Sequence, residues 1–591
     1  MPSVPTDLRP VPRSTDRPAR RPRRRPVSAF GKVSIGIAVL FAALALYPLG
    51  AVVHRLLFSG GSLDLGPIRE TLAEPGLVAL LVNTIVVVVA STAIALVIGT
   101  VLAWVNERTD ARMGVLTDAL PMVPFLLPPV AGAIGWVLLL SPRAGYLNSV
   151  LRDLLGAVGI TMTEGPFDIY SWYGLIGVYT IYQVPYAFML ASAGLRNLDP
   201  SLEEQSRVSG AGPLRTLRKV TMPGVQPSLA GAVLLMLWSG FGLFSIPAVI
   251  GTGADIDILS VRIVESLAEY PSRTGVAVGL SLIVVVFVAL AWWAQRLVVG
   301  RGRHATVGGK GQRVSRIRLG RWRGPVRALM VLYLVVTTVL PLVALLIVSL
   351  TGFWTTKINW GALGFDALRR AIIDDSTTQE ALLNSLGLGL LGATIGIGVA
   401  AVVALYVSKA GRLGRFLDGA IKFPSTLSHI VLAVGFVLAL AGPPFELGGT
   451  LTILLLAYLA LYLPQAAVAA DAAVAQVGGE LPEASRVGGA GEARTFRRVY
   501  LPLMLPGLIT GWALLFVRMI GDLTASSILA GTGNPVVGFR ILEIYQNGSY
   551  ATLAALSTVL TVISCAVVLV VMVLSRRSAR WSTPTTPTGA R

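Results

Sequence analysis

Long apolar runs constrain this chain more than any other feature of its sequence. The run from Val82 to Val101 contains no charged residue, and the run from Leu280 to Leu297 contains one, Arg296. Runs of 18 or more apolar residues are long enough for a helix to cross about 30 Å of hydrocarbon. Hydrophobic residues make up 54% of the chain and charged residues 13%, about half the charged fraction of a soluble protein. The sequence therefore predicts an all-α membrane protein with many spans.

The apolar runs divide into about twelve predicted spans, and the charges beside them set their orientation. Basic residues cluster in the N-terminal tail, in the segment 299–324 and after the last span. Six spans separate each cluster from the next, so all three lie on one side. Because cytoplasmic loops carry the excess of Lys and Arg, both termini are predicted to be cytoplasmic. The predicted spans are 31–54, 78–104, 114–140, 172–195, 224–250, 274–298, 325–350, 381–407, 416–441, 450–474, 503–530 and 549–574.

The segment 299–324 is also the predicted domain boundary, because it mixes arginines with several glycines and has no acidic residue. The net charge of +19 is interpreted as a topology signal and as contact with anionic lipid, not as nucleic-acid binding. The predicted organisation is a disordered basic cytoplasmic tail (1–30), a first six-span domain (31–298), a basic cytoplasmic linker (299–324), a second six-span domain (325–575) and a cytoplasmic tail (576–591).

The two halves repeat each other. Ser201–Pro223 reads SLEEQSRVSGAGPLRTLRKVTMP and Leu481–Pro502 reads LPEASRVGGAGEARTFRRVYLP. Identical positions lie 279 residues apart, as Glu204 and Glu483 do, and no gap is needed. Both halves begin inside, so the duplication is parallel. Weaker matches pair Asn83-Thr84 with Asn384-Ser385, Arg262 with Arg540, and Glu265 with Glu543.

The repeated loop joins the fourth and fifth spans of each half on the predicted cytoplasmic side. We expect a short amphipathic helix, a bend at Gly210 or Gly489, where glycine permits φ > 0, and a second basic helix that ends at Pro223 or Pro502. Such an elbow can transmit a push from a partner to the spans. A basic loop without a partner is the alternative, but it does not explain a match of more than twenty residues without a gap.

This loop resembles the EAA motif in the permeases of binding-protein-dependent ABC importers. That motif is Glu-Ala-Ala, three residues, Gly, nine residues and Ile-x-Leu-Pro, and Gln205 is the largest departure from it. The resemblance implies two tandem six-helix transmembrane domains of the type I ABC importer class in a bacterial plasma membrane, with both motifs acting in ATPase coupling. The residues that match the motif are Glu204, Gly210 and Pro223 in the first copy and Glu483, Gly489 and Pro502 in the second.

The resemblance also implies partners. No Walker A pattern occurs in the chain, so ATP must be bound by another protein, and two EAA loops imply two ATPase subunits. An external solute-binding protein must be a separate chain as well. The stretch Gly521–Leu529 is similar to a Glu-Leu-Pro-Ala-Thr-Leu-Leu-Leu segment of ferric-iron permeases, although Asp522 replaces Glu and Thr524 replaces Pro. Ferric iron is therefore the favoured solute, and thiamine, phosphonate and polyamine are the other candidates.

Two ionisable residues fall inside the eleventh predicted span. Arg518 and Asp522 lie four residues apart on one helix face. A charge at membrane depth is costly unless it is paired, and it marks a functional hypothesis. The pair either neutralises itself or lines the translocation path. His429 in the ninth span is expected to make a hydrogen bond between two helices, and contact with the solute is the alternative role.

Other classes of function find less support in the sequence. The three histidines are far apart and predict no metal site; no cofactor and no catalytic cluster are expected, so the chain is predicted to be a transport subunit and not an enzyme. The alternative is an ion-coupled secondary transporter. Such a protein would need titratable groups in several spans, and it would leave the repeated loops unexplained.

Overall fold

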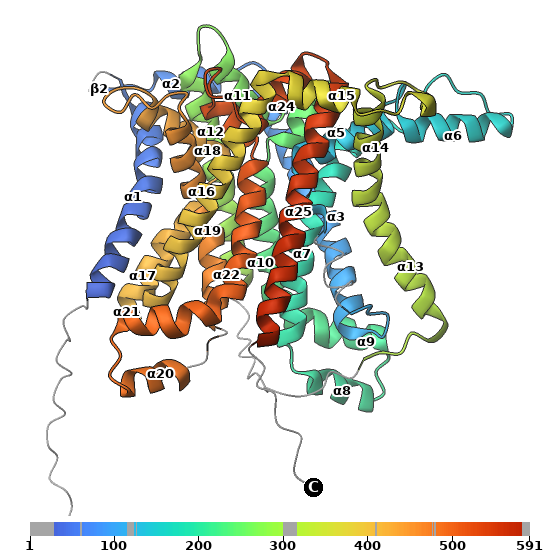
Figure 1. Cartoon of the computed structure of the whole chain (residues 1–591). Helices are drawn as coiled ribbons and strands as arrows, with labels where there is room; N and C mark the ends of the chain where they lie inside the picture. The colour runs from blue at the N-terminus through green and yellow to red at the C-terminus, as the bar shows by residue number, and fades with distance from the viewer. Residues whose placement is uncertain are drawn as a thin grey trace, which may run out of the picture.

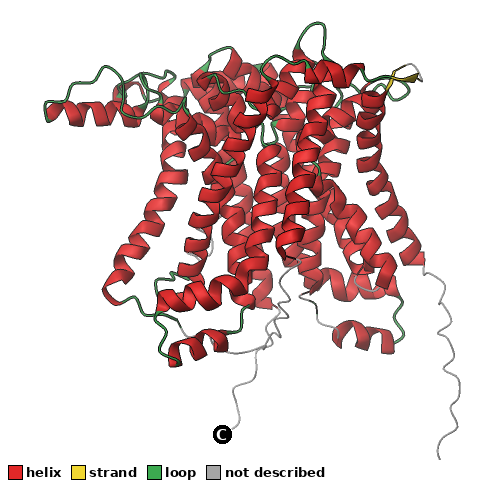
Figure 2. Ribbon diagram, turned by 180° about the vertical axis from the view of Figure 1, so that it is seen from behind, coloured by secondary structure: helices red, strands yellow, loops and turns green. Residues whose placement is uncertain are grey.

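The computed structural model describes residues 29–59, 62–114, 123–125, 127–299, 316–407, 411–475, 477 and 480–581. Most of the predicted N-terminal tail and linker, and the last ten residues, lie outside these ranges. The described backbone is almost wholly helical, apart from a small hairpin of two strands (Figure 2). Long helices stand side by side in one bundle, and short helices cover its two ends (Figure 1).

The helices follow the predicted duplication. The first half contains α1 (Ala29–Leu57), β1 (Phe58–Ser59), β2 (Ser62–Leu63), α2 (Gly66–Leu72), α3 (Leu77–Arg108), α5 (Pro129–Leu140), α6 (Tyr146–Ala157), α7 (Trp172–Asn197), α8 (Pro200–Val208), α9 (Pro213–Thr216), α10 (Met222–Phe241), α11 (Leu259–Ala268) and α12 (Thr274–Val299). The second half contains α13 (Arg323–Leu334), α14 (Leu340–Thr351), α15 (Asp366–Arg369), α16 (Ser376–Val407), α17 (Gly411–Lys422), α18 (His429–Phe436), α19 (Leu451–Ala475), α20 (Glu480–Val487), α21 (Glu492–Thr495), α22 (Leu501–Ile520), α23 (Thr524–Leu529), α24 (Val537–Gln546) and α25 (Tyr550–Trp581).

Ten helical segments of the described chain are long and apolar enough to cross a membrane, and they overlap ten of the twelve predicted spans. In the described part of the two exceptions, 114–140 and 416–441, the apolar helices Pro129–Leu140 and His429–Ala441 are shorter than a span. Proline removes a backbone donor and clashes with the preceding turn. The Pro128-Pro129 pair therefore stands at the start of α5, whereas the break before α18 follows a 3-10 turn at Phe423–Thr426 that the sequence analysis does not predict.

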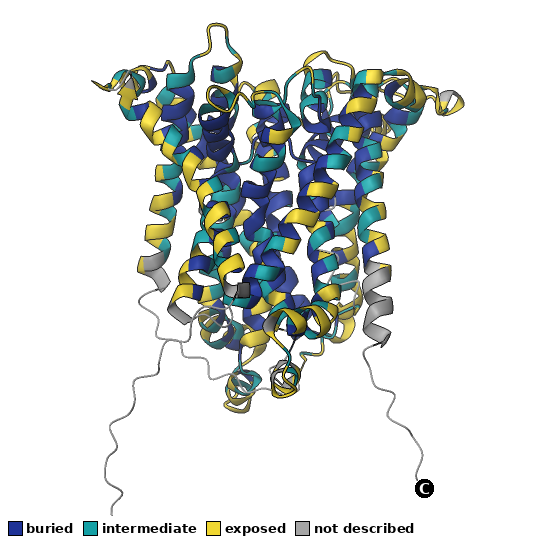
Figure 3. Cartoon of the chain, turned by 60° about the vertical axis from the view of Figure 1, so that its left-hand side comes forward, coloured by how far each residue is buried: buried dark blue, intermediate teal, exposed yellow. Residues whose placement is uncertain are grey.

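Burial changes from the centre of the bundle to its rim. Residues on the central helices are mostly buried, whereas the outer helices show rows of exposed apolar side chains (Figure 3). In a membrane, that outer surface faces lipid, so exposed apolar side chains there carry no penalty. The centre is therefore the place where polar groups can meet.

The two halves interlock through their first long helices. Helix α1 packs on α16, α17 and α18 of the second half, and α14 packs on α5 of the first half. The crossings are equivalent and close. A side chain at Gly435 would lie 2.7 Å from the Pro48 carbonyl oxygen, and one at Gly135 would lie 2.8 Å from that of Pro341. Only glycine allows helices to approach so closely, so each six-span unit holds the other in place.

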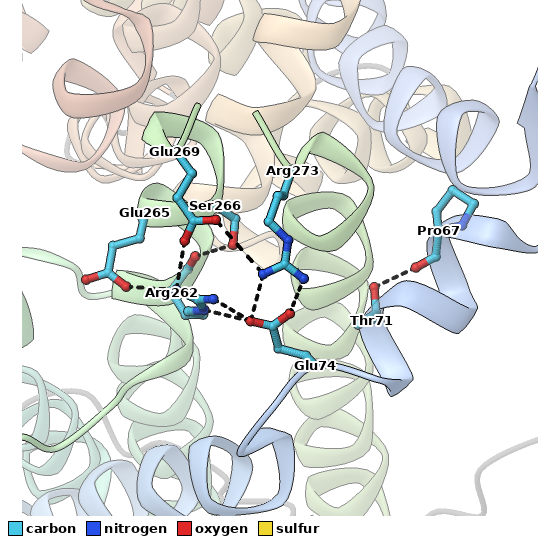
Figure 4. A network of polar contacts seen from close by, with 8 residues as sticks. All are labelled: Pro67, Thr71, Glu74, Arg262, Glu265, Ser266, Glu269 and Arg273. Atoms are coloured by element: carbon cyan, nitrogen blue, oxygen red, sulfur yellow. Dashed lines mark hydrogen bonds and ion pairs between the residues drawn. The ribbon is translucent and has the colours of Figure 1, made fainter. Parts of the chain in front are cut away.

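A polar cluster fastens the first half (Figure 4). It lies beside α2 and α11, at the end of the bundle opposite α8 and α20 (Figure 1). Glu74, in the loop before α3, accepts hydrogen bonds from Arg262 of α11 (Nη2 to Oε1, 2.5 Å) and from Arg273 (Nη2 to Oε2, 2.5 Å). Asn83 and Thr84 hold the chain that leads into α11: Asn83 Nδ2 donates to the Asp257 carbonyl at 3.3 Å, and Thr84 Oγ1 accepts from the Leu259 N–H at 3.0 Å. We call this set the first clasp.

The second half repeats the clasp at equivalent positions. Arg540 of α24 reaches Asp375, directly before α16, with Nη2 2.7 Å from Oδ2. Asn384 Nδ2 donates to the Pro535 carbonyl at 2.9 Å, and Ser385 Oγ accepts from the Val537 N–H at 2.8 Å. The clasps therefore explain why Asn83-Thr84 and Arg262 return in the second half. They fix the short helices α11 and α24 over the ends of the long ones.

We expect Glu74→Gln to lower the stability of the protein by on the order of 3 kcal/mol at neutral pH, because it leaves two arginines facing a neutral group. Burial alone would raise the pKa of Glu74, but the hydrogen bonds and charges of Arg273 and Arg262 outweigh it and lower that pKa below its ordinary value of 4.5. The stabilisation is therefore present at neutral pH and is lost as the pH falls from about 4.5 through the folded pKa. The unfolding temperatures of the wild type and of Glu74→Gln in detergent, compared between pH 7 and pH 3, measure this loss of stabilisation.

The matched control is Arg143→Gln, which breaks the exposed Arg143–Glu164 pair. Such pairs contribute about 0–1 kcal/mol, so this variant should unfold close to the wild-type temperature. Equal effects of the two variants, or a Glu74→Gln effect that does not shrink as the pH falls below about 4.5, would contradict the clasp as a stabilising contact.

Candidate functional site

Two elbows hang below the bundle, one from each half, and they are the repeated loops of the sequence (Figure 1). The first consists of α8 and α9, and the second of α20 and α21. Each bends at the predicted glycine: Gly210 has φ +82° and Gly489 has φ +78°. The N–H of the residue after the glycine bonds back five residues, Ala211 to Ser206 at 3.0 Å and Ala490 to Ser485 at 3.1 Å. This is the Schellman ending of a helix, which needs a left-handed residue at the bend.

A pair of hydroxyl groups closes each elbow. Ser206 Oγ lies 3.0 Å from Thr216 Oγ1, and Ser485 Oγ lies 3.0 Å from Thr495 Oγ1. The hydrogen bond joins the two limbs of the elbow across the bend. The repeated Ser and Thr of the motif are therefore structural, since they hold the limbs at one angle.

The second limb does not end at the proline, contrary to the prediction. Helical structure is continuous from Pro213 to Phe241 and from Ala493 to Ile520. A π-helical turn precedes each proline, with the Met222 N–H bonded to the Leu217 carbonyl in the first half. Pro223 and Pro502 then fall in the first turn of α10 and α22, where a missing N–H costs little. Each elbow thus continues into the membrane as one rod of roughly 40 Å, at 1.5 Å per residue.

A buried ion pair anchors the first elbow, and the sequence analysis missed it. Glu203, next to the motif residue Glu204, lies with Oε2 2.8 Å from Nε of Arg108 at the end of α3. The Thr221 hydroxyl donates to Glu203 Oε1 at 2.7 Å, and Arg108 Nη2 donates to the Leu195 carbonyl at 2.7 Å. Position 482, the equivalent of Glu203, is proline. The second elbow therefore has no carboxylate at that position, and the two elbows differ in how they are held.

The tips of both elbows are exposed. Glu204 and Glu483 are exposed, and so are the adjoining apolar side chains of Val208 (89%) and Val487 (90%), which occupy equivalent positions. Helices α8 and α20 lie beyond the lower ends of the long helices, at the end of the bundle (Figure 1). Matched pairs of acidic and apolar side chains at two equivalent tips form a surface suited to a partner present in two copies.

The rods meet at a small cavity in the middle of the bundle, between the two halves. Its volume is about 90 Å³. The indole Nε1 of Trp238 in α10 donates to the Leu427 carbonyl of the second half at 3.0 Å. Polar and aromatic side chains from both halves line the cavity, among them Tyr186, Trp238, Ser239, Ser245, His429, Tyr462, Gln465, Arg518, Asp522 and Thr524.

Arg518 and Asp522 both line this cavity, but they do not pair with each other. Asp522 Oδ2 accepts from the Tyr462 hydroxyl at 2.7 Å, and Oδ1 accepts from the N–H groups of Ala525 and Ser526 at 2.8 and 3.3 Å. The Asp522 carboxylate thus accepts hydrogen bonds from the N–H groups in the first turn of α23, the helix that follows α22. Mutual neutralisation, one of the two predicted roles, is not the arrangement found.

Arg518 turns toward the first half. Its guanidinium carbon lies 4.6 Å from the centroid of the Phe125 ring, and Nη2 donates to the Tyr186 hydroxyl at 3.3 Å. His429 makes ring contacts instead of the expected hydrogen bond: its centroid lies 5.8 Å from Trp238 and 5.5 Å from Tyr462. Its Nε2 atom is buried without a hydrogen-bond partner in the described part of the chain.

Comparison with known proteins agrees with this architecture. The sequence model of the family "Binding-protein-dependent transport system inner membrane component" matches residues 95–304 and again 392–583. The chain belongs to this family. The two matches cover more than half of the chain and fall one in each half, so the predicted fold of two tandem permease domains is confirmed, as is the predicted membership of the ABC importer permeases.

Two of three curated relatives match most of the chain, and the third matches less than half of it. It is 26% identical to the probable ABC transporter permease protein y4fN of Sinorhizobium fredii, over 87% of this chain and 90% of that one. It is 23% identical to the ferric transport system permease protein FbpB of Actinobacillus pleuropneumoniae, over 88% and 74%. It is 27% identical to the sulfate transport system permease protein CysT of Salmonella typhimurium, over 42% and 85%. The last two relatives are named for different solutes.

We expect Gly489→Asp to leave the permease folded in the membrane but to uncouple ATP hydrolysis from transport. A non-glycine residue in the left-handed region costs on the order of 1–2 kcal/mol, which is enough to reset the bend of the elbow without unfolding the bundle. The control is Gly491→Asp, two residues further on, where φ is not positive and a side chain meets nothing within 4 Å. Transport and ATPase rates of the assembled importer give the test. Normal coupling in Gly489→Asp would show that the bend is dispensable.

Proposed function

We propose that this permease moves a small solute into a bacterial cell by alternating access, driven by two copies of a separate cytoplasmic ATPase. An external binding protein delivers the solute at the end of the bundle that carries the clasps. The permease supplies the path and the coupling surfaces, and ATP is bound and hydrolysed by the partner. In this orientation both termini are cytoplasmic, and the domains are 31–298 and 325–575.

One observation carries the proposal: two equivalent elbows project from the same end of the bundle and expose the same side chains. Glu204 and Glu483 are free to meet basic groups of an ATPase, and Val208 and Val487 provide apolar contacts beside them. Gly210 and Gly489 set the bend, and Pro223 and Pro502 mark where each elbow enters its rod. Two elbows fit two ATPase copies.

The rods supply the mechanism. When ATP draws the two ATPases together, each ATPase would move the elbow that it holds. The Ser–Thr hydroxyl pairs would keep the angle between the two limbs of each elbow constant during this movement. The movement then passes along Pro213–Phe241 and Ala493–Ile520 to the cavity, where Ser239 and Arg518 lie near the far ends of the two rods. Rocking of the interlocked halves would open the cavity to one side of the membrane and then to the other.

Ferric iron is the solute that we propose first. The stretch Gly521–Leu529, which resembles the corresponding segment of ferric-iron permeases, contributes Gly521, Asp522 and Thr524 to the cavity wall. A relative named as a ferric permease matches most of the chain, but another is named for sulfate. Thiamine, phosphonate and polyamine stay as the other candidates.

The test is a pull-down of the detergent-solubilised chain with the ATPase encoded nearest to it. We expect about two ATPase copies per chain to bind the wild type and none to bind the double variant Glu204→Lys/Glu483→Lys, because the charge reversal repels basic groups on the partner. The control, Glu164→Lys, reverses an exposed acidic group at the other end of the bundle and should retain both copies.

Each of the single variants should lose one docking site and bind about one ATPase per chain. Failure of the wild type to bind, or full binding by the double variant, would remove the elbows as docking sites. An ion-coupled secondary transporter would then be the function to test, by uptake without ATP in the presence of an ion gradient.

A further inference from the structure

Arg518 is a cation in the centre of the membrane, and most of its donors are open. A guanidinium has five N–H donors, yet in the described chain only the Tyr186 hydroxyl accepts a hydrogen bond from it, at 3.3 Å. No carboxylate of the described residues lies within ion-pair distance of it, and the Phe125 ring covers one face. A charge at this depth is costly unless it is paired, and it marks a functional hypothesis. Arg518 is one of the residues that line the cavity.

The neighbouring acid does not cancel this cation. Both oxygens of Asp522 are occupied, by the Tyr462 hydroxyl and by two backbone N–H groups at the start of α23. The Asp522 side chain is buried against that helix end. The Asp522 carboxylate is therefore hydrogen-bonded within the second half. Among the described residues, the Arg518 guanidinium has no anionic partner.

Other polar side chains on the cavity wall lack partners as well. Within the described chain, no side-chain hydrogen bond is made by Ser239, Ser245, Gln465 or Thr524, all of which line the cavity. His429 adds a buried Nε2 without a partner. The His429 atom departs from the rule that buried polar groups are almost always hydrogen-bonded. Ser239 and Gln465 are only partly buried, so their hydroxyl and amide groups are open to a polar ligand beside the cation. Hydroxyl and amide donors beside an arginine match the oxygens of an anion.

We propose that this cavity binds an oxyanion group of the transported solute, with the Arg518 guanidinium as its principal ligand. The inference rests on the proposed function, since it takes the cavity to be the transport path. The shared chemistry is negatively charged oxygen, either in a free tetrahedral oxyanion or in a carboxylate or phosphate that coordinates ferric iron. A guanidinium binds such groups through two parallel hydrogen bonds, whereas it repels a bare metal cation, thiamine or a polyamine.

The internal symmetry of the chain offers a sharp variant. Ser239 is the equivalent of Arg518, 279 residues earlier, and both line the cavity from the two rods. Moving the arginine from one rod to the other, as Arg518→Ser/Ser239→Arg, keeps one cation in the cavity. A purely structural Arg518 would not be replaced in this way, because its Phe125 and Tyr186 contacts belong to one side only.

The experiment measures thermal unfolding of the full chain in lipid nanodiscs, with sulfate, molybdate, phosphate, citrate or ferric citrate added, against chloride at equal ionic strength. We expect at least one oxyanion to raise the unfolding temperature of the wild type, with its half-effective concentration raised about tenfold or more in Arg518→Gln. Arg518→Lys should be intermediate, and the swapped double variant should recover part of the effect. Arg143→Gln, on an exposed arginine, should respond as the wild type does.

The choice of probe separates the two sources. A response to sulfate, molybdate or phosphate alone indicates a free oxyanion, and a response to ferric citrate that exceeds that to citrate indicates a ferric complex. The inference is overturned if no probe shifts the wild type, or if Arg518→Gln responds equally. ATPase binding in the pull-down is read separately: if it is retained while the anion response is absent, only the inference fails, and if it is lost, the proposed function fails.

Discussion

A lipid bilayer gives no hydrogen bonds to the backbone, so every break in a spanning helix has to be satisfied inside the protein. The central breaks of this chain obey that constraint. The helix that ends at Ile520 resumes at Thr524, and the Asp522 carboxylate accepts the N–H groups of the new start. On the facing side, the chain breaks before His429, and Trp238 donates to a carbonyl at that break. The breaks bring polar atoms to the centre, and the cavity is the result.

The rest of the molecule connects the elbows to the cavity at the centre of the bundle. The clasps hold the short helices α11 and α24 at one end, and the elbows project at the other. Between them run two long rods, each continuous with an elbow and each contributing side chains to the cavity wall. The glycine crossings of α1 on α18 and of α14 on α5 tie the halves together. A displacement at one elbow can therefore reach the interface of the halves along its rod.

The two halves of the chain differ at the first elbow and in the cavity wall. Arg108 and Glu203 brace only the first elbow, since position 482 is proline. Arg518 and Asp522 occur only in the second half, opposite Ser239 and Leu243. A duplicated scaffold thus carries one charged wall and one neutral wall, and a single asymmetric solute can be held between them.

The sequence predicts most of the scaffold and little of the site. Apolar runs predict the ten long helices, and the repeat predicts both elbows and the bends at Gly210 and Gly489, because these signals are local. The partners of Glu203 and Asp522 could not be predicted, because Arg108 and Tyr462 reach them only through packing between helices. The sequence analysis places a helix end at Pro223, because the π-helical turn before this proline cannot be recognised from the residue types. Only the recurrence of Asn83-Thr84 and of Arg262 in the second half points to the clasps.

The most direct test of the account follows the elbows themselves. The chain has one cysteine, Cys565, so Val208→Cys and Val487→Cys in a Cys565→Ser background place two spin labels at equivalent exposed tips. Their separation is measured by pulsed electron resonance in the assembled importer, without nucleotide and with ATP trapped by vanadate. The account predicts that the distance shortens when ATP is trapped, and that Gly489→Asp weakens this change. An identical distance in both states would contradict the claim that the elbows carry the movement of the ATPases into the membrane.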